Sequence, residues 1–254
     1  MSDLEDEFED IFGEGVVYEQ PKKGAILFQE TSNYYHFAHF GWGIKSRFYG
    51  YIKGYKEVSD MAIEKAVTSQ DIVLLDTYVF PIIFNYRQFL ELSLKSLYLD
   101  YSDDAPQLRI QTIEKVSHDL MKIWRKVEPI SLSPYKDKDH HREMVKVVES
   151  YLLQYHEMDE KSFNFRYPIT KQLTPVFSKE MRVDLVNLRN RMQELSNFFD
   201  GMDGALDDMK RSKEEWEAEY RRIEDDIRSE IEAEMRAEWR SEMAAEARAN
   251  RDWE

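Results

Sequence analysis

From Ile44 onward, apolar residues recur at steps of three and four, and this helical period persists through most of the chain. The sequence of 254 residues holds only 9 Gly and 7 Pro, whereas a turn-rich all-β fold needs such residues every few positions. With 42% apolar residues, the chain is long enough for one sizeable core or two small ones. We therefore expect an all-α protein.

Several functional classes are excluded by what the sequence lacks. It has no cysteines, which rules out disulfides, zinc-thiolate sites, iron-sulfur clusters and cysteine nucleophiles. No apolar run approaches the roughly 18 to 20 residues that span a bilayer, and the start is acidic where a secretion signal is basic. It also lacks a glycine-rich phosphate loop, a GxSxG elbow and an HExxH motif. We expect a cytoplasmic protein without membrane contact or cofactor.

The net charge of -15 is concentrated at the two ends of the chain. Residues 1–14 hold seven acidic residues and no basic one, and residues 205–254 hold seventeen acidic and ten basic residues. The intervening part is nearly neutral, with 26 acidic and 25 basic residues. An acidic protein of this kind is not expected to bind DNA non-specifically, because phosphate binding needs clustered Lys and Arg.

The first 43 residues divide into an acidic tail, 1–14, and an extension, 15–43. Phe8, Ile11 and Phe12 interrupt the acidic tail at helical spacing. The tail is thus either a disordered solubilising segment or a linear motif that folds onto a partner or onto its own chain. In the extension, GVVYEQ and GAILFQE are two short segments that predict an irregular structure or a short hairpin.

Residues 44–203 predict an antiparallel helical bundle. The first helix runs from Ile44 to about Val67, and the second, over 70–101, is apolar around most of its circumference, as expected of a central helix. Pro81 should kink or break this second helix. A third helix should run from Pro106 to its end at Pro129. Amphipathic segments over 144–155 and from Val183 onward complete the bundle.

Residues 204–254 predict a long, charged helix that mediates association. Glu, Arg and Ala dominate this segment, and it contains no proline. Its large apolar residues mostly follow steps of four, so the stripe they form winds around the helix and departs from a strict heptad. They are Trp216, Tyr220, Ile223, Ile227, Ile231, Met235, Trp239 and Met243. The helix is either a solvated appendage or a contact surface for a protein partner or a second copy.

A polar strip on the central helix is the first candidate site. Arg87, Glu91 and Lys95 follow one another at steps of four, so they share one face of an otherwise apolar helix. They form either an exposed charge ladder or a polar cleft that binds a small anion such as a nucleotide, together with His118 and Asp119. The histidine pairs HFAH (36–39) and 140–141 have no carboxylate four residues after either member, so we expect no metal site.

Four strings carry a resemblance to a known family. YRQFLELSLKSL, at 86–97, and SHDLMKIW, at 117–124, resemble the HEPN superfamily of prokaryotic helical-bundle proteins. FRYPITK, at 165–171, and VDLVNLRNRMQELSNFFDG, at 183–201, are similar to a poorly characterised bacterial subset of that superfamily. The resemblance covers about residues 44–202. It implies a helical bundle that acts in a bacterial defence or toxin-antitoxin system.

The resemblance also implies a possible activity, from which this sequence departs. Active members of the superfamily cleave RNA with an arginine followed four to six residues later by a histidine. Here the closest ordering is Arg109 to His118, with eight residues between them. We therefore expect a non-catalytic scaffold that acts through protein interaction. The alternative is a divergent metal-independent ribonuclease that uses His118 with Arg87 or Arg166.

His118 also has a purely structural interpretation. Ser117 would cap a helix that begins after it, and Asp119 would lie in the first turn of that helix, where a negative charge is favourable. In that case the histidine has no catalytic role.

Overall fold

The computed structural model describes residues 20–40, 43–135, 138–160, 162–177 and 179–251. The chain divides into two compact units, Met1–Trp42 and Gly43–Glu254, which are treated separately below. Within the described residues, the regular structure is helical, with one isolated bridge between Ile169 and Pro175 and no strand. The predicted all-α fold is therefore confirmed.

The described part of the first unit, residues 20–40, consists of turns and irregular segments. Gly24 has a φ of 82°, a conformation that favours glycine, and the Ala25 amide donates to the Lys22 carbonyl across this turn. The hairpin considered for 15–43 is absent from these described residues, although 15–19 lie outside them. The acidic tail with Phe8, Ile11 and Phe12 also lies outside the described residues.

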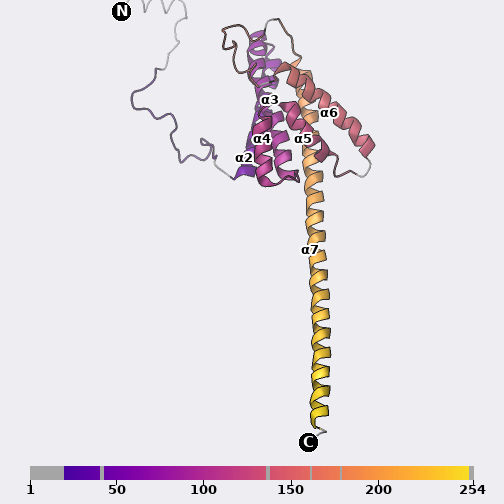
Figure 1. Ribbon diagram of the computed structural model, residues 1–254. Coiled ribbons are helices and arrows are strands. Elements are labelled where there is room, and N and C mark those ends of the chain that lie inside the picture. Colours follow the sequence, from indigo (N-terminus) through magenta and orange to yellow (C-terminus); the bar gives the residue numbers. More distant parts are fainter. Residues whose placement is uncertain (1–19, 41–42, 136–137, 161, 178, 252–254) are drawn as a thin grey trace, which may run out of the picture. The chain divides into compact units, whose positions relative to one another are not determined.

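The second unit contains the helices (Figure 1). They are α2 (Ile44–Ser69), α3 (Ile72–Tyr101), α4 (Pro106–Val116), α5 (Leu120–Ser131), α6 (Lys138–Met158) and α7 (Leu185–Arg251). No helix in the described part of the chain combines the length and the apolar character that a bilayer crossing needs.

A tight connection joins α2 and α3. Gln70 ends α2 in the left-handed region, with a φ of 54°, and Asp71 caps α3 by accepting a hydrogen bond from the Val73 amide at 2.8 Å. Helix α3 then continues to Tyr101 without interruption, with Pro81 inside it. The possible break at Pro81 is therefore absent. Pro81 lies in the first part of α3, which is less buried than the part that follows it.

The segment predicted as one helix from Pro106 to Pro129 is two helices. Ser117 follows α4 with a φ of 51°, which interrupts the helix, and Asp119 starts α5. Helix α5 also continues past Pro129 to Ser131. Apolar residues continue at steps of three and four across the interruption, and the last one of α4 and those of α5 are buried: Val116, Leu120, Ile123 and Val127. Periodicity alone therefore concealed the break.

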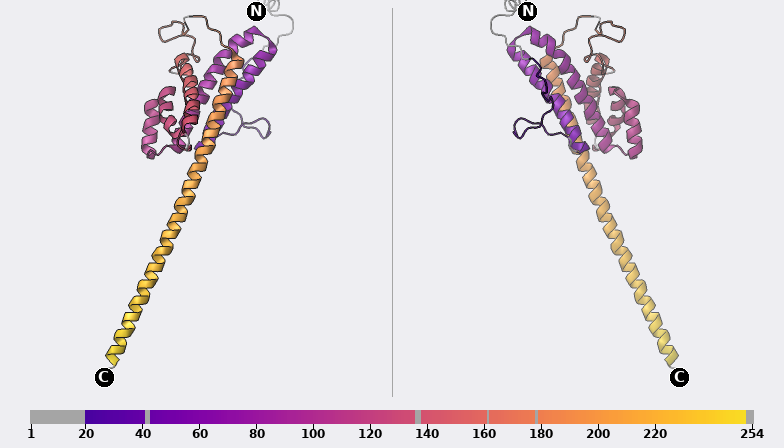
Figure 2. Two further views of the ribbon diagram at one scale, coloured as in Figure 1. Left: turned by 90° about the vertical axis from the view of Figure 1, so that its right-hand side faces the viewer. Right: turned by 90° about the vertical axis from the view of Figure 1, so that its left-hand side faces the viewer.

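Helix α3 is the centre of the core, as its composition predicted. It contacts α2, α4, α5 and α7, and α6 packs against α5. Leu90 and Leu94 are completely buried, and so is Trp124 of α5. Figure 2 shows α2, α3 and the first part of α7 lying side by side in both views. The bundle prediction is therefore confirmed.

Helix α7 spans 67 residues and has two different environments. It begins after Asp184, whose carboxylate accepts a hydrogen bond from the Asn187 amide at 2.9 Å. Its first part buries one face, formed by Leu185, Leu188 (partly buried), Met192, Leu195, Phe199, Met202 and Leu206. The boundary expected at residues 203–204 is absent, because the helix passes through Gly201 and Gly204 and Leu206 is still in the core.

Candidate functional site

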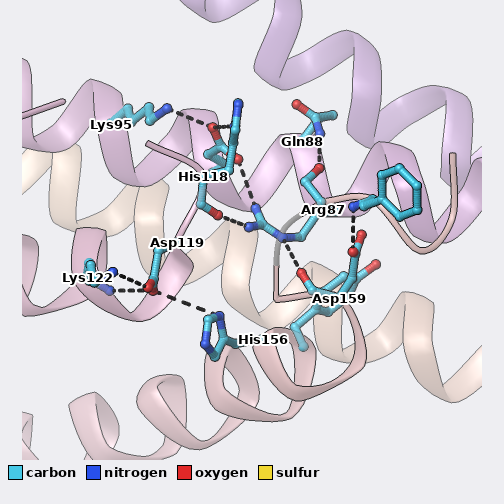
Figure 3. A network of polar contacts seen from close by, with 12 residues as sticks. Arg87, Gln88, Lys95, His118, Asp119, Lys122, His156 and Asp159 are labelled. Atoms are coloured by element: carbon cyan, nitrogen blue, oxygen red, sulfur yellow. Dashed lines mark hydrogen bonds and ion pairs between the residues drawn. The ribbon is translucent and has the colours of Figure 1, made fainter. Parts of the chain in front are cut away.

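The predicted polar strip of α3 is a buried chain of ion pairs. The side chains of Arg87 and Glu91 are 0% and 3% exposed. Arg87 Nη1 lies 3.1 Å from Glu91 Oε2, and Lys95 Nζ lies 2.7 Å from Glu91 Oε1 (Figure 3). The exposed charge ladder considered from the sequence is therefore wrong for Arg87 and Glu91. Buried charges need such partners, since an unpaired one is costly.

Arg87 also binds the backbone of two loops. Its Nη2 donates to the His118 carbonyl, between α4 and α5, and its Nε donates to the Asp159 carbonyl at 3.4 Å, just after α6. Burial lowers the pKa of Arg87, and the carboxylates of Glu91 and Asp159 oppose that effect. Arg87 thus connects the central helix to two loops that are distant in sequence.

The loop after α6 is ordered by a second set of contacts. Asp159 Oδ1 accepts from the amides of Phe163 and Asn164, at 2.7 and 3.0 Å. Gln88 of α3 donates to Ser162 Oγ at 2.8 Å. Of the residues that follow α6, only Arg166 was among the predicted site residues. The contacts of Asp159 and Ser162 were not predicted from the sequence.

His118 lies at the edge of this network with its side chain 56% exposed. Its Nδ1 is 2.9 Å from Glu91 Oε1, the same oxygen that Lys95 contacts. Burial raises the pKa of Glu91, but Lys95, Arg87 and His118 together outweigh it and lower that pKa below its ordinary value. The carboxylate therefore stays ionised and fixes the orientation of the imidazole.

Asp119 caps α5, a role that the sequence had assigned to Ser117. Its Oδ1 accepts from the Lys122 amide at 3.0 Å, and its Oδ2 pairs with Lys122 Nζ at 3.0 Å. His156 Nδ1 of α6 lies 3.9 Å from the same carboxylate. Ser117 has a positive φ, which does not fit the cap position. Asp119 therefore fixes the start of α5 and faces α6.

The ribonuclease alternative required a guanidinium that faces solvent beside His118. Arg87 contacts the His118 backbone but is fully buried, so it does not meet this requirement. The Arg166 guanidinium lies over the rings of Phe84 and Tyr167, 5.9 Å from each centroid. Lys95 is linked to the His118 ring through Glu91, since Lys95 Nζ and His118 Nδ1 contact the same carboxylate oxygen.

The predicted ligand-binding residues do not line the groove of about 860 Å³ between α2, α3 and α7. Its walls are other residues, including Phe48 of α2, Phe89 of α3 and Phe199 of α7. Within the described residues, no three His, Asp, Glu or Cys side chains form a group that could hold a metal ion. The anion-binding prediction therefore gains no support from this groove.

The second candidate site is the exposed part of α7. From residue 207 to 245, every side chain is exposed except that of Ala218, which is half-buried. The predicted interaction residues Trp216, Tyr220, Ile223, Ile227, Ile231, Met235 and Trp239 are 48 to 67% exposed. Trp216 and Tyr220 stack on each other with ring centroids 5.5 Å apart. These apolar side chains therefore lie in solvent, where an isolated helix gains nothing from them.

The exposed apolar residues of α7 continue the spacing of its buried residues, which end at Leu206. From Leu185 to Ile227, one residue every three or four positions, alternately, lies on the same stripe, and all of these residues are apolar except Lys213. This part of α7 therefore follows a stricter heptad than its exposed apolar residues alone had indicated. Only at Ile231 do repeated steps of four begin. We call the exposed section of this heptad the distal seam. It consists of Met209, Lys213, Trp216, Tyr220, Ile223 and Ile227.

Comparisons with protein-family models, with curated proteins and with solved structures give no match for this chain. The resemblance to the HEPN superfamily therefore remains a prediction.

Proposed function

We propose that this chain is a non-catalytic helical scaffold that binds a protein partner through the exposed part of α7. From the HEPN-like resemblance, we further propose that this scaffold acts in a bacterial defence or toxin-antitoxin system. The observation that carries the proposal is the heptad of α7, which continues in one register past the point where the bundle ceases to cover it. Coiled-coil seams of this type bury themselves against another helix.

The polar network supports the same proposal. Arg87 forms an ion pair with Glu91 and donates to two loop carbonyls inside the bundle. Buried charges that are paired in this way hold the fold together. A bundle held in this way provides a rigid base for α7.

The test compares the full chain with an Ile223→Glu/Ile227→Glu variant, each recovered with an affinity tag from the cells that produce the protein. We expect a protein that co-purifies with the full chain and is lost with the variant, and that binds again when both purified proteins are mixed. Circular dichroism of the variant should be unchanged. The proposal fails if no protein and no second copy distinguishes the variant from the full chain.

A truncation of α7 tests whether the partner binds to its exposed part. Because Leu206 is buried, the cut belongs after Lys210, and a cut at 205 would remove part of the core. The truncated chain should keep its thermal unfolding transition and lose the partner. Loss of the transition would show that the distal part of α7 stabilises the bundle.

A second candidate function is metal-independent RNA cleavage at His118. It is favoured by one observation, the exposed imidazole whose Nδ1 is held by a buried carboxylate. In this version Lys95 would supply the cation that the buried Arg87 does not. Our main proposal expects no cleavage of RNA above background in EDTA. Cleavage that disappears in a folded His118→Ala variant would favour the ribonuclease instead.

A further inference from the structure

The distal seam of α7 carries acidic residues on both of its edges. Glu217 and Glu224 directly follow seam residues, and Glu219 and Asp226 directly precede them. These are the flanking positions that face a partner helix across a heptad seam. All four side chains are exposed. Lys210, which follows Met209, is basic, but between Trp216 and Ile227 no basic residue occupies a flanking position.

A second copy of this chain fits these edges poorly. In a parallel pair in register, Glu219 of one copy faces Glu224 of the other, and Lys213 faces Lys213 within the seam. In an antiparallel pair, the edge with Glu219 and Asp226 faces the same acidic edge. Both arrangements therefore oppose like charges at the position where the apolar contact would form.

The opposite charge pattern would remove this conflict. We infer that the partner of the distal seam is a different helix, with an apolar heptad seam of its own and Lys or Arg at its flanking positions. An acidic residue in its seam, opposite Lys213, completes the match, since polar seam residues select register and partner. The stacked Trp216 and Tyr220 are the anchors, because buried aromatic residues dominate binding energy at such contacts. This inference rests on the proposed function.

The experiment uses the full chain and two fluorescently labelled synthetic peptides of four heptads. Both peptides have Ile and Leu in the seam and one Asp opposite Lys213, and they differ only in Lys or Glu at the flanking positions. Anisotropy titrations at about 0.1 M salt should show at least about tenfold tighter binding of the Lys peptide. The preference should shrink in 1 M salt, where surface charges are screened.

Two variants with the same change of net charge locate the effect. Glu217→Lys/Glu219→Lys/Glu224→Lys reverses the seam edges and should invert the preference for the two peptides. Glu214→Lys/Glu215→Lys/Asp225→Lys changes acidic residues on the side of α7 away from the seam. This second variant should keep the preference for the Lys peptide, which excludes a general attraction between an acidic and a basic chain.

The outcomes separate this inference from the proposed function. Equal binding of the two peptides, or a second variant that loses the preference as fully as the first, overturns the charge-matched partner. A chain that sedimentation shows to be dimeric at about 10 μM, with the dimer lost in Ile223→Glu/Ile227→Glu, overturns it in favour of a second copy and leaves the proposed function intact. Binding of neither peptide, without self-association, overturns the charge-matched partner, whereas the proposed function fails only if the co-purification experiment also finds no partner.

Discussion

Helices α3 and α7 depart from the usual distribution of residues in opposite directions. α3 buries charges, and each buried charge has a partner, as in the pair Arg87–Glu91. The distal part of α7 exposes apolar residues, and no residue in the described part of the chain covers them. A buried charge that is satisfied within the chain serves the fold, whereas an apolar seam that is left unsatisfied indicates a surface for another molecule.

The largest effect should come from breaking the buried charge network of α3. Arg87→Ala removes one partner of a buried pair and the donor for two loop carbonyls, and we expect a loss of about 3–5 kcal/mol in unfolding free energy. Urea unfolding measures it. Glu232 and Arg236 of α7 form an exposed pair at the same four-residue spacing, so Arg236→Ala should cost less than about 0.5 kcal/mol. Similar losses in the two variants would contradict the comparison.

The apolar residues of the two helices should differ in the same way. Leu90→Ala or Leu94→Ala in α3 should cost about 2–5 kcal/mol, because each removes a fully buried side chain and leaves a cavity. Ile227→Ala in α7 removes a side chain of similar size that is 51% exposed. In the same urea titrations, that change should remain within about 0.5 kcal/mol of the unaltered chain. A large loss for Ile227→Ala would mean that α7 folds back onto the bundle.

These differences also show what the sequence could predict. The apolar circumference of α3 and the period of α7 follow from local spacing, so both helices and the central place of α3 were predictable. Two boundaries did not follow from spacing. The apolar spacing continues across Ser117, so the helix start there was indicated only by the capping residues, as an alternative. The absence of a break at Gly201 depends on the burial of Leu206 beyond it. Spacing reports which residues share a face, but it does not report backbone dihedral angles.

The polar site was predictable only in part. Arg87, Glu91 and Lys95 were placed together by their helical spacing, and His118 was joined to them as a hypothesis about ligand binding or RNA cleavage. The contact between His118 and Glu91 depends on the fold, since the turn between α4 and α5 brings the two residues together. Asp159 was missed because its contribution is a backbone carbonyl and a carboxylate that orders its own loop. A backbone acceptor leaves no pattern in the sequence.

The charge network should make stability depend on pH through Glu91. Its pKa in the folded protein is lowered from the ordinary 4.5, so the folded state binds this proton less readily than the unfolded state. The contribution is present in full above pH 4.5 and is lost as the pH falls through the lowered pKa. Glu91→Gln should be less stable at neutral pH and lose less on acidification. Glu232→Gln, on exposed α7, should leave the unfolding free energy at neutral pH within about 0.5 kcal/mol of the unaltered chain, because its ion pair is exposed.

The exposed seam of α7 should contribute to binding without contributing to stability. Ile223→Glu/Ile227→Glu should leave the unfolding free energy of the purified chain within about 0.5 kcal/mol, because both side chains are about half exposed. The same variant should lose the partner. If this variant loses both unfolding free energy and partner binding, the distal seam stabilises the fold and is not a separate binding surface.

A small effect on stability is also expected at His118, where the two kinds of region meet. The imidazole contacts the buried network through Glu91 but is itself 56% exposed. Without it, Glu91 keeps Arg87 and Lys95, so no buried charge loses its only partner. His118→Ala should therefore cost less than about 1 kcal/mol in urea unfolding. A loss comparable to that of Arg87→Ala would assign His118 to the structural network, and an intact fold with altered RNA cleavage would instead assign it to catalysis.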